Sequence, residues 1–141
     1  MVNPVTFFPD PMLIIQKSLG SLSVQHQAIA NNVANIDTPN FKRTVVSFQD
    51  KLHQALYPNP TSPLWRTHPM HFPQPSPITI DNFKPDVQVI TDTIGRNDGN
   101  NVDMEMEQGL LAENSILYNS MTNVLNRYMA GLRHSISEGR Q

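Results

Sequence analysis

The chain is organised around residues 30–41, which read ANNVANIDTPNF. A helix must end within this stretch, because Thr38 stands before Pro39 and a residue before proline is pushed out of the helical region. Three of the five residues at 31–35 are asparagines. Their amides compete for backbone hydrogen bonds and cost about 1–2 kcal/mol of helix propensity relative to alanine. These asparagines therefore need partners, either on a neighbouring helix that approaches closely over the small alanines or in local caps at a frayed helix end.

A long helix is predicted over 12–36, leading into this stretch. Its apolar residues recur at alternating steps of four and three, which is typical of a helix that packs against another helix. Pro11 suits the first turn, and Asp10 before it suits the N-cap. At 1.5 Å per residue the helix is about 38 Å long. The seam consists of Ile15, Leu19, Leu22, Ile29, Val33 and Ile36, with His26 in the gap.

A second long helix is predicted over 103–136, after the turn-forming cluster at 97–101. Asp103 can cap it, and Glu105 and Glu107 lie where the helix dipole favours negative charge. Its apolar face is wider than a two-stranded seam requires, which indicates more than one neighbour. One stripe consists of Leu110, Leu117, Met121, Val124, Tyr128 and Leu132, and the adjacent stripe of Leu111, Tyr118, Leu125, Met129 and Ile136.

The middle of the chain differs from both ends. Seven prolines between positions 58 and 77 exclude a regular helix or a central strand there. The rest is expected to form extended loop with at most one hairpin. The short elements predicted in it are strands at 44–48, 79–80 and 86–90 and a helix at 48–56.

These elements predict a mainly α fold. The N- and C-terminal helices pack antiparallel as a coiled-coil-like hairpin, and an extended, proline-rich middle segment contributes little β structure. The apolar surface of the helices exceeds what two helices can cover, so either the middle segment or other subunits must cover the rest. The predicted division is an N-terminal helix with its motif at 1–40, an irregular segment at 41–97 and a C-terminal helix at 98–141.

Composition narrows the possible functions. Charged residues make up 16% of the 141 residues, against roughly 25% in a typical domain. Either other subunits cover part of the surface, or Asn, Gln, Ser and Thr replace charge on it. A net charge of −2 provides no basic field for nucleic acid. The absence of cysteine excludes disulfides and thiolate chemistry, and no apolar run approaches the ~18 residues of a membrane span. The first fifteen residues lack the basic start and cleavage site of a secretory signal.

Catalytic, cofactor and metal sites are not expected. His68 and His71 are separated by Pro69, so they do not share a helical face, and no acidic residue or cysteine follows nearby. A calcium loop around Gly99 would put Ile94 and Arg96 at ligand positions, and neither can bind calcium. No histidine or nucleophile pairs with Glu105, Glu107 or Glu113 of the last helix, and the sequence has no glycine-rich phosphate loop.

The stretch at 30–41 resembles the N-terminal signature of bacterial flagellar axial proteins, the rod, hook and hook-associated subunits. Many rod and hook members have glycine where this chain has Asn40, which is more similar to the FlgB type of rod protein. The segment at 66–71 is similar to the middle of that type, and the segments at 98–105 and 111–115 with Tyr118 are similar to its C-terminal entry. The proline-rich tract at 72–77 matches no part of the family pattern.

The resemblance implies a structural subunit of the proximal rod, the shaft that transmits torque from the membrane ring towards the hook by self-assembly of its terminal helices. Implied partners are further copies, other rod proteins, the rod-to-ring adaptor FliE, the membrane ring and the flagellar type III export apparatus. The implied location is the periplasmic basal body, reached without a cleaved signal. The alternatives are a different rod subunit or a soluble helical export adaptor or chaperone. The implied assembly motif is Asn31, Asn32, Asn35, Thr38, Pro39 and Phe41. The helix-packing residues are Leu19, Leu22, Ile29, Val33, Leu110, Leu117, Met121, Val124, Leu125, Tyr128 and Leu132.

Overall fold

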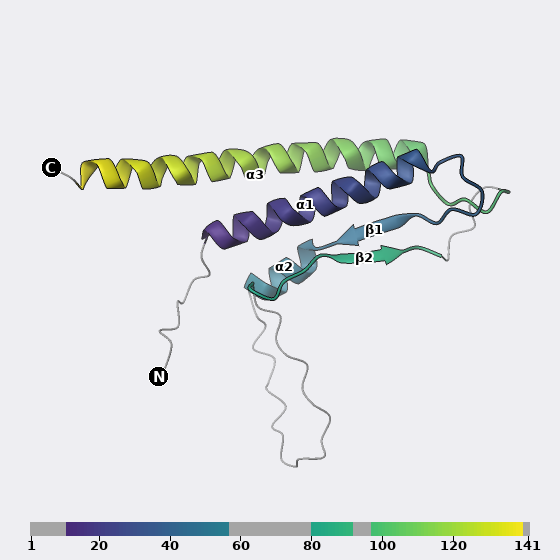
Figure 1. The fold of residues 1–141 in the computed structure, drawn as a ribbon, viewed down its shortest axis with the longest axis horizontal. Helices are drawn as coiled ribbons and strands as arrows, with labels where there is room; N and C mark the ends of the chain where they lie inside the picture. Colours follow the sequence, from purple (N-terminus) through teal and green to yellow (C-terminus); the bar gives the residue numbers. More distant parts are fainter. Residues whose placement is uncertain (1–10, 57–79, 92–96, 140–141) are drawn as a thin grey trace, which may run out of the picture.

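Two long helices dominate the computed structural model, which describes residues 11–56, 80–91 and 97–139. They lie side by side and run in opposite directions (Figure 1). Most described residues are helical, and the only strands among them form one small sheet. The predicted mainly α fold with an antiparallel helix pair is therefore confirmed. The elements are α1 (Pro11–Ala34), β1 (Thr44–Ser47), α2 (Gln49–Leu56), β2 (Asp86–Val89) and α3 (Met104–Glu138).

Local sequence signals fix the ends of both long helices. The first helix begins at Pro11, as its tolerated place in a first turn predicts. It ends at Ala34, two residues before the predicted end, where the backbone hydrogen bonds change from the i→i−4 to the i→i−3 type: the Ile36 N–H donates to the Val33 carbonyl at 3.4 Å. Helix α3 starts after Asp103, whose carboxylate accepts from the backbone N–H of Glu105 at 2.9 Å. The predicted N-cap of α3 is thus confirmed.

The small sheet joins two distant parts of the chain. Strand β1 pairs antiparallel with β2, with Val46 opposite Val87, and α2 and residues 57–79 come between them in the sequence. The strand predicted at 79–80 is wrong for Ile80, which lies in a turn, and Thr79 lies outside the described residues. The tract that carries His68 and His71 also lies outside them.

The hydrophobic core lies where the sheet and α2 meet the helix pair. Its central members are Leu22 of α1 and the two phenylalanines that flank the sheet, Phe48 and Phe83. Leu52 of α2 and Leu117 and Met121 of α3 pack against them. The Lys17 ammonium donates to the Asp81 carbonyl at 3.0 Å, which ties the turn before β2 to α1. The middle segment therefore covers part of the apolar helix surface.

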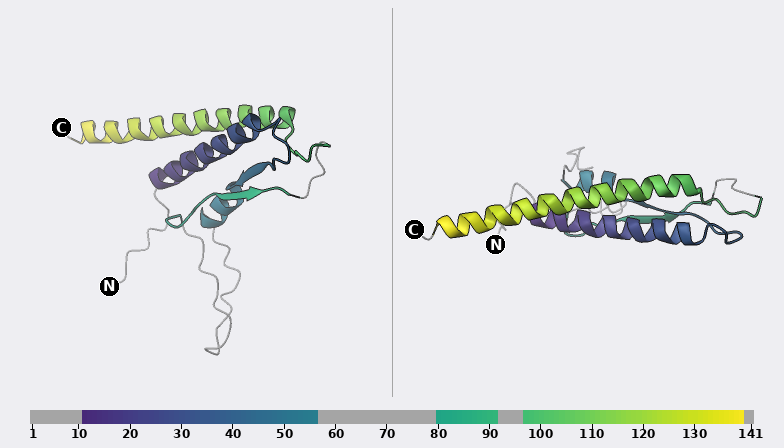
Figure 2. Two further views of the ribbon diagram at one scale, coloured as in Figure 1. Left: turned by 45° about the vertical axis from the view of Figure 1, so that its right-hand side comes forward. Right: turned by 90° about the horizontal axis from the view of Figure 1, so that it is seen from above.

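Helix α3 is longer than its partner. At 1.5 Å per residue, its 35 residues span about 53 Å, against about 36 Å for the 24 residues of α1. The C-terminal turns of α3 consequently extend past the start of α1 (Figures 1 and 2). None of the helices in the described ranges combines the length and the hydropathy that a membrane span requires.

Candidate functional site

The asparagine-rich end of α1 is the centre of a polar junction. Asn32 is 1% exposed, although asparagine is usually a surface residue. Its amide nitrogen donates to the Thr44 carbonyl at 2.8 Å, and its amide oxygen accepts from the Thr44 N–H at 2.9 Å. The same nitrogen lies 3.2 Å from Oε1 of Glu107. One side chain therefore joins the end of α1 to β1 and to the first turn of α3.

Glu107 is the acidic partner in this junction, and it is fully buried. Its Oε1 accepts from Nε of Arg43 in a short ion pair, and from Asn32. Its Oε2 is buried without a hydrogen-bond partner in the described structure. A buried carboxylate needs a charged partner, because losing its water costs several kcal/mol. Arg43 supplies that charge and thereby fixes the residue before β1 against α3.

Asn100 connects the segment before α3 to the end of α1. It is fully buried, and its amide nitrogen lies 2.9 Å from three carbonyl oxygens, those of Asn35, Ile36 and Thr38. Its amide oxygen accepts from the Val102 N–H at 2.8 Å. The last carbonyls of a helix have no partner within the helix. Asn100 provides partners for the carbonyls that follow α1, so the two sequence motifs bind each other.

Further bonds hold the same two segments together. Asn101 accepts from the Arg43 N–H at 2.6 Å and donates to the Ile90 carbonyl at 2.7 Å. The Lys42 ammonium donates to the Gly99 carbonyl at 2.8 Å. At Gly99 φ is +77°, and a Cβ there would lie 2.7 Å from Oδ1 of Asn40. Glycine is therefore required at this turn, both for its backbone and for the close approach of the facing asparagine.

The structure divides the six assembly-motif residues between the interior and the surface. Only Asn32 is fully buried, while Asn35 and Phe41 are half-buried. The Asn35 amide oxygen accepts from the Thr38 hydroxyl at 3.2 Å, which is a local bond within the turn. Three of the six remain exposed: Asn31, Thr38 and Pro39.

The predicted helix-packing residues also differ in burial. Leu22 and Ile29 are buried, whereas Val124 and Leu132 are 47% and 44% exposed. The remaining seven are half-buried: Leu19, Val33, Leu110, Leu117, Met121, Leu125 and Tyr128.

The polar residues buried between α1 and α3 are not predicted by the apolar pattern of the sequence. Asn114 is 2% exposed and donates to the Leu22 carbonyl and to Oε1 of Gln25, both at 3.1 Å. The sequence pattern predicts that Glu107 interacts favourably with the helix dipole, but it does not predict that Glu107 is buried. The spacing of the residues could have indicated this burial, because Glu107 and Asn114 are seven residues apart and Met121 follows after seven more. The buried side of α3 passes through all three.

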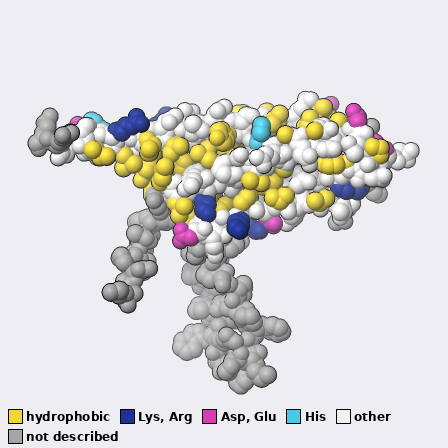
Figure 3. Space-filling view, viewed as in Figure 1, with side chains coloured by type: hydrophobic (Ala, Val, Ile, Leu, Met, Phe, Trp, Pro, Cys, Tyr) yellow, Lys and Arg dark blue, Asp and Glu magenta, His cyan; other side chains and the backbone are white. Residues whose placement is uncertain are grey.

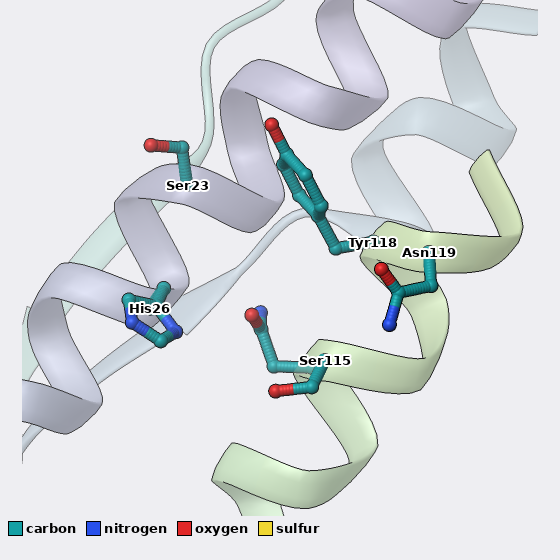
Figure 4. A pocket seen from close by; sticks show the side chains of 6 residues that line it. Ser23, His26, Ser115, Tyr118 and Asn119 are labelled. Atoms are coloured by element: carbon teal, nitrogen blue, oxygen red, sulfur yellow. The ribbon is translucent and has the colours of Figure 1, made fainter. Parts of the chain in front are cut away.

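A polar groove follows the seam on one side. It has a volume of about 350 Å³ and is lined by Ser23 and His26 of α1 and by side chains of α3. Figure 4 shows Ser115, Tyr118 and Asn119 facing these α1 residues across the groove. The histidine that fills the gap in the predicted seam is thus exposed to this groove. Within the described ranges, no three metal-binding side chains come together.

The C-terminal half of α3 presents an apolar surface (Figure 3). Large apolar side chains there remain well exposed even though the helix lies beside α1. Their exposed fractions are 47% for Val124, 38% for Met129, 44% for Leu132 and 74% for Ile136. In the N-terminal half of α3, Ile116 and Tyr118 are also exposed, at 67% and 43%.

Comparisons with known proteins agree on one family. Residues 21–42 match the family model described as flagella basal body rod protein. The chain is similar to the flagellar basal body rod protein FlgB of Borreliella burgdorferi, with 33% identity over 81% of this chain and 86% of the relative. It is also similar to FlgB of Bacillus subtilis, with 29% identity over 96% of this chain and 100% of the relative. FlgB of Aquifex aeolicus is 32% identical over 76% of this chain and 82% of the relative. The chain therefore belongs to the FlgB family of flagellar basal body rod proteins.

Proposed function

We propose that this structural subunit lies in the proximal rod of the flagellar basal body and transmits torque through contacts that neighbouring subunits make with its long helices. The observation that carries the proposal is the apolar surface left exposed on both sides of the α1–α3 seam. A monomeric protein rarely exposes a large contiguous apolar patch, and such patches commonly mark protein–protein contacts.

The position of the exposed residues supports contacts on two sides of α3. At 3.6 residues per turn, Val124 and Met129 lie about 80° and 60° to either side of the line through buried Asn114. They are 47% and 38% exposed, whereas Asn114 is 2% exposed. Helix α1 therefore covers the centre of the apolar face and leaves its flanks for other chains.

The polar junction gives the subunit a mechanical role. Asn32, Glu107 and Asn100 fix the end of α1 to β1 and to the start of α3. Because packed protein interiors transmit strain, a load applied to one helix passes to the other at this end. The hydrogen bonds resist sliding of the two helices, and the apolar flanks carry the load to the next subunit.

The family supports a set of partners that remain part of the proposal. These are further copies of the chain, other rod proteins, the adaptor FliE and the membrane ring. The proposed location is the periplasm, and the proposed route is the flagellar type III export apparatus without a cleaved signal. The role is structural rather than catalytic and uses no cofactor.

The test is a pair of matched aspartate substitutions in the bacterium that encodes this chain. Val124→Asp places a charge on an apolar flank, while Asn123→Asp places the same charge opposite the buried Asn114 line, about 100° from the Val124 flank and about 120° from the Met129 flank. Asn123 is exposed. We expect Val124→Asp to abolish swimming in soft agar and to remove rods from isolated basal bodies, and Asn123→Asp to preserve both. Circular dichroism of the purified variants checks that both remain helical. Normal rods with Val124→Asp would contradict the proposal.

A further inference from the structure

The side of α3 that packs on α1 continues beyond the start of α1. Leu132 follows Asn114 by eighteen residues, which is five full helical turns, so both lie on one line along the helix. Asn114 is 2% exposed and Leu132 is 44% exposed. The difference arises because α1 begins at Pro11 and does not reach Leu132. The last turns of α3 therefore carry a continuation of the buried face without a partner among the described residues.

The register of the helix pair identifies which part of the chain belongs opposite Leu132. Asn32 bonds Glu107, and Gln25 bonds Asn114, and in each pair the residue numbers add to 139. The same register places Pro11 opposite Tyr128. It places Leu132 opposite position 7, within the ten residues that precede α1.

We infer that residues 1–10 of the same chain dock on this exposed end of α3, with Phe7 or Phe8 covering Leu132. The segment has the right chemistry, since it carries two adjacent phenylalanines and its only charged side chain is Asp10. It also has the right reach. Three residues of extended backbone let Phe8 lie up to about 10 Å from Pro11, at 3.3–3.6 Å per residue. Along α3, the rise from Tyr128, which lies opposite Pro11, to Leu132 is only about 6 Å.

Covalent attachment favours the chain's own segment over one from a second copy. A short flexible tether gives an effective concentration in the millimolar range, far above that of a dilute subunit in solution. Docking at Leu132 also leaves Val124 and Met129 uncovered, because these residues lie on the flanks of α3. The inference is thus compatible with the proposed contacts between subunits but does not depend on them.

Disulfide trapping tests the inference, because the chain contains no cysteine. The full-length chain receives either Phe8→Cys with Leu132→Cys or Phe8→Cys with Ala130→Cys. Ala130 lies about 160° from the Asn114 line, so this pair is a control at nearly the same distance along the sequence. We expect the pair at 132 to form an intrachain disulfide in dilute oxidising solution about tenfold faster than the pair at 130. This ratio corresponds to about 1.4 kcal/mol.

Two results would overturn the inference. Equal rates for the two pairs would mean that the segment has no preferred side of α3. Disulfide-linked dimers in place of intrachain products would mean that a second copy supplies the segment. Gel electrophoresis without reductant separates the two products.

A second measurement leaves position 8 unchanged. The rate of alkylation of the cysteine is compared between the single variant Leu132→Cys and a variant that also carries Phe7→Ser and Phe8→Ser. Circular dichroism checks that the two proteins have equal helix content. We expect the serine substitutions to speed alkylation about tenfold, and an unchanged rate would refute the inference. Both measurements use the isolated chain, so a failure of rod assembly would not affect their results.

Discussion

Replacing Asn100 with alanine should destabilise the subunit more than any exposed polar substitution. The Asn100 amide nitrogen contacts three carbonyl oxygens at 2.9 Å, and its oxygen accepts one N–H at 2.8 Å. The nitrogen has only two hydrogens, so these contacts amount to about three full hydrogen bonds. At about 1 kcal/mol for each bond, the expected loss is about 3 kcal/mol in the free energy of unfolding. Asn100 is 0% exposed, so water does not replace these bonds without local opening.

Urea unfolding followed by circular dichroism measures this loss. With an m-value of about 2 kcal/mol/M, a loss of 3 kcal/mol lowers the midpoint by about 1.5 M. Asn100→Asp keeps the size of the side chain but replaces the donors with a negative charge facing three carbonyls. We expect it to destabilise at least as much as Asn100→Ala, which distinguishes lost hydrogen bonds from lost packing.

Asn97→Ala is the matched control, because Asn97 is exposed in the same turn. It should shift the midpoint by less than about 0.3 M, since surface substitutions usually stay within about 0.5 kcal/mol. A midpoint shift below about 0.5 M for Asn100→Ala, or a neutral Asn100→Asp, would refute the conclusion that Asn100 holds the turn after α1 in place.

Two further predictions concern charged residues. Glu107→Ala should lower the free energy of unfolding, measured in urea, by about 3–5 kcal/mol, because it leaves the Arg43 charge without its buried partner. An unchanged midpoint would show that this ion pair does not stabilise the junction. The hydrogen bond from the Lys51 ammonium, and then that from Gln88, lower the pKa of Asp86 below its usual 3.8. A lowered pKa stabilises the fold above pH 3.8, and this contribution disappears as pH falls through the folded value. The Asp86→Asn variant should therefore lose less stability than the wild type when the pH falls below 3.8. Thermal unfolding at a series of pH values measures this loss. Melting temperatures that fall equally with pH in both proteins would contradict the role of Lys51.

The helix pair is predictable from sequence because its signals are local. Pro11 begins one helix and Asp103 caps the other, and each acts within one turn of its own position. Apolar spacing of three and four residues predicts that the helices pack together. The same reasoning ends α1 two residues too late, because the turn after Ala34 is formed by backbone bonds of the i→i−3 type, which apolar spacing does not predict.

The junction is not predictable in the same way, because its bonds join residues far apart in the chain. Apolar periodicity counts asparagine and glutamate as surface residues, yet Asn32 and Glu107 are buried through their contact with each other. Nothing near Glu107 in the sequence identifies Arg43 as its partner, 64 residues away. The pairing of β1 with β2 has the same origin, since α2 and residues 57–79 separate the two strands.

The position of Asn100 also determines when the fold can be completed. Its bonds to the end of α1 close loops of 62 to 65 residues. Closing a loop of that length costs about 4 kcal/mol of chain entropy by the logarithmic loop law. The bonds cannot form until residue 100 is present. In a chain that emerges N-terminus first, the turn after α1 therefore lacks its Asn100 partner until most of the chain has emerged. The junction is then a late folding event, and until it forms the C-terminal end of α1 unfolds more easily.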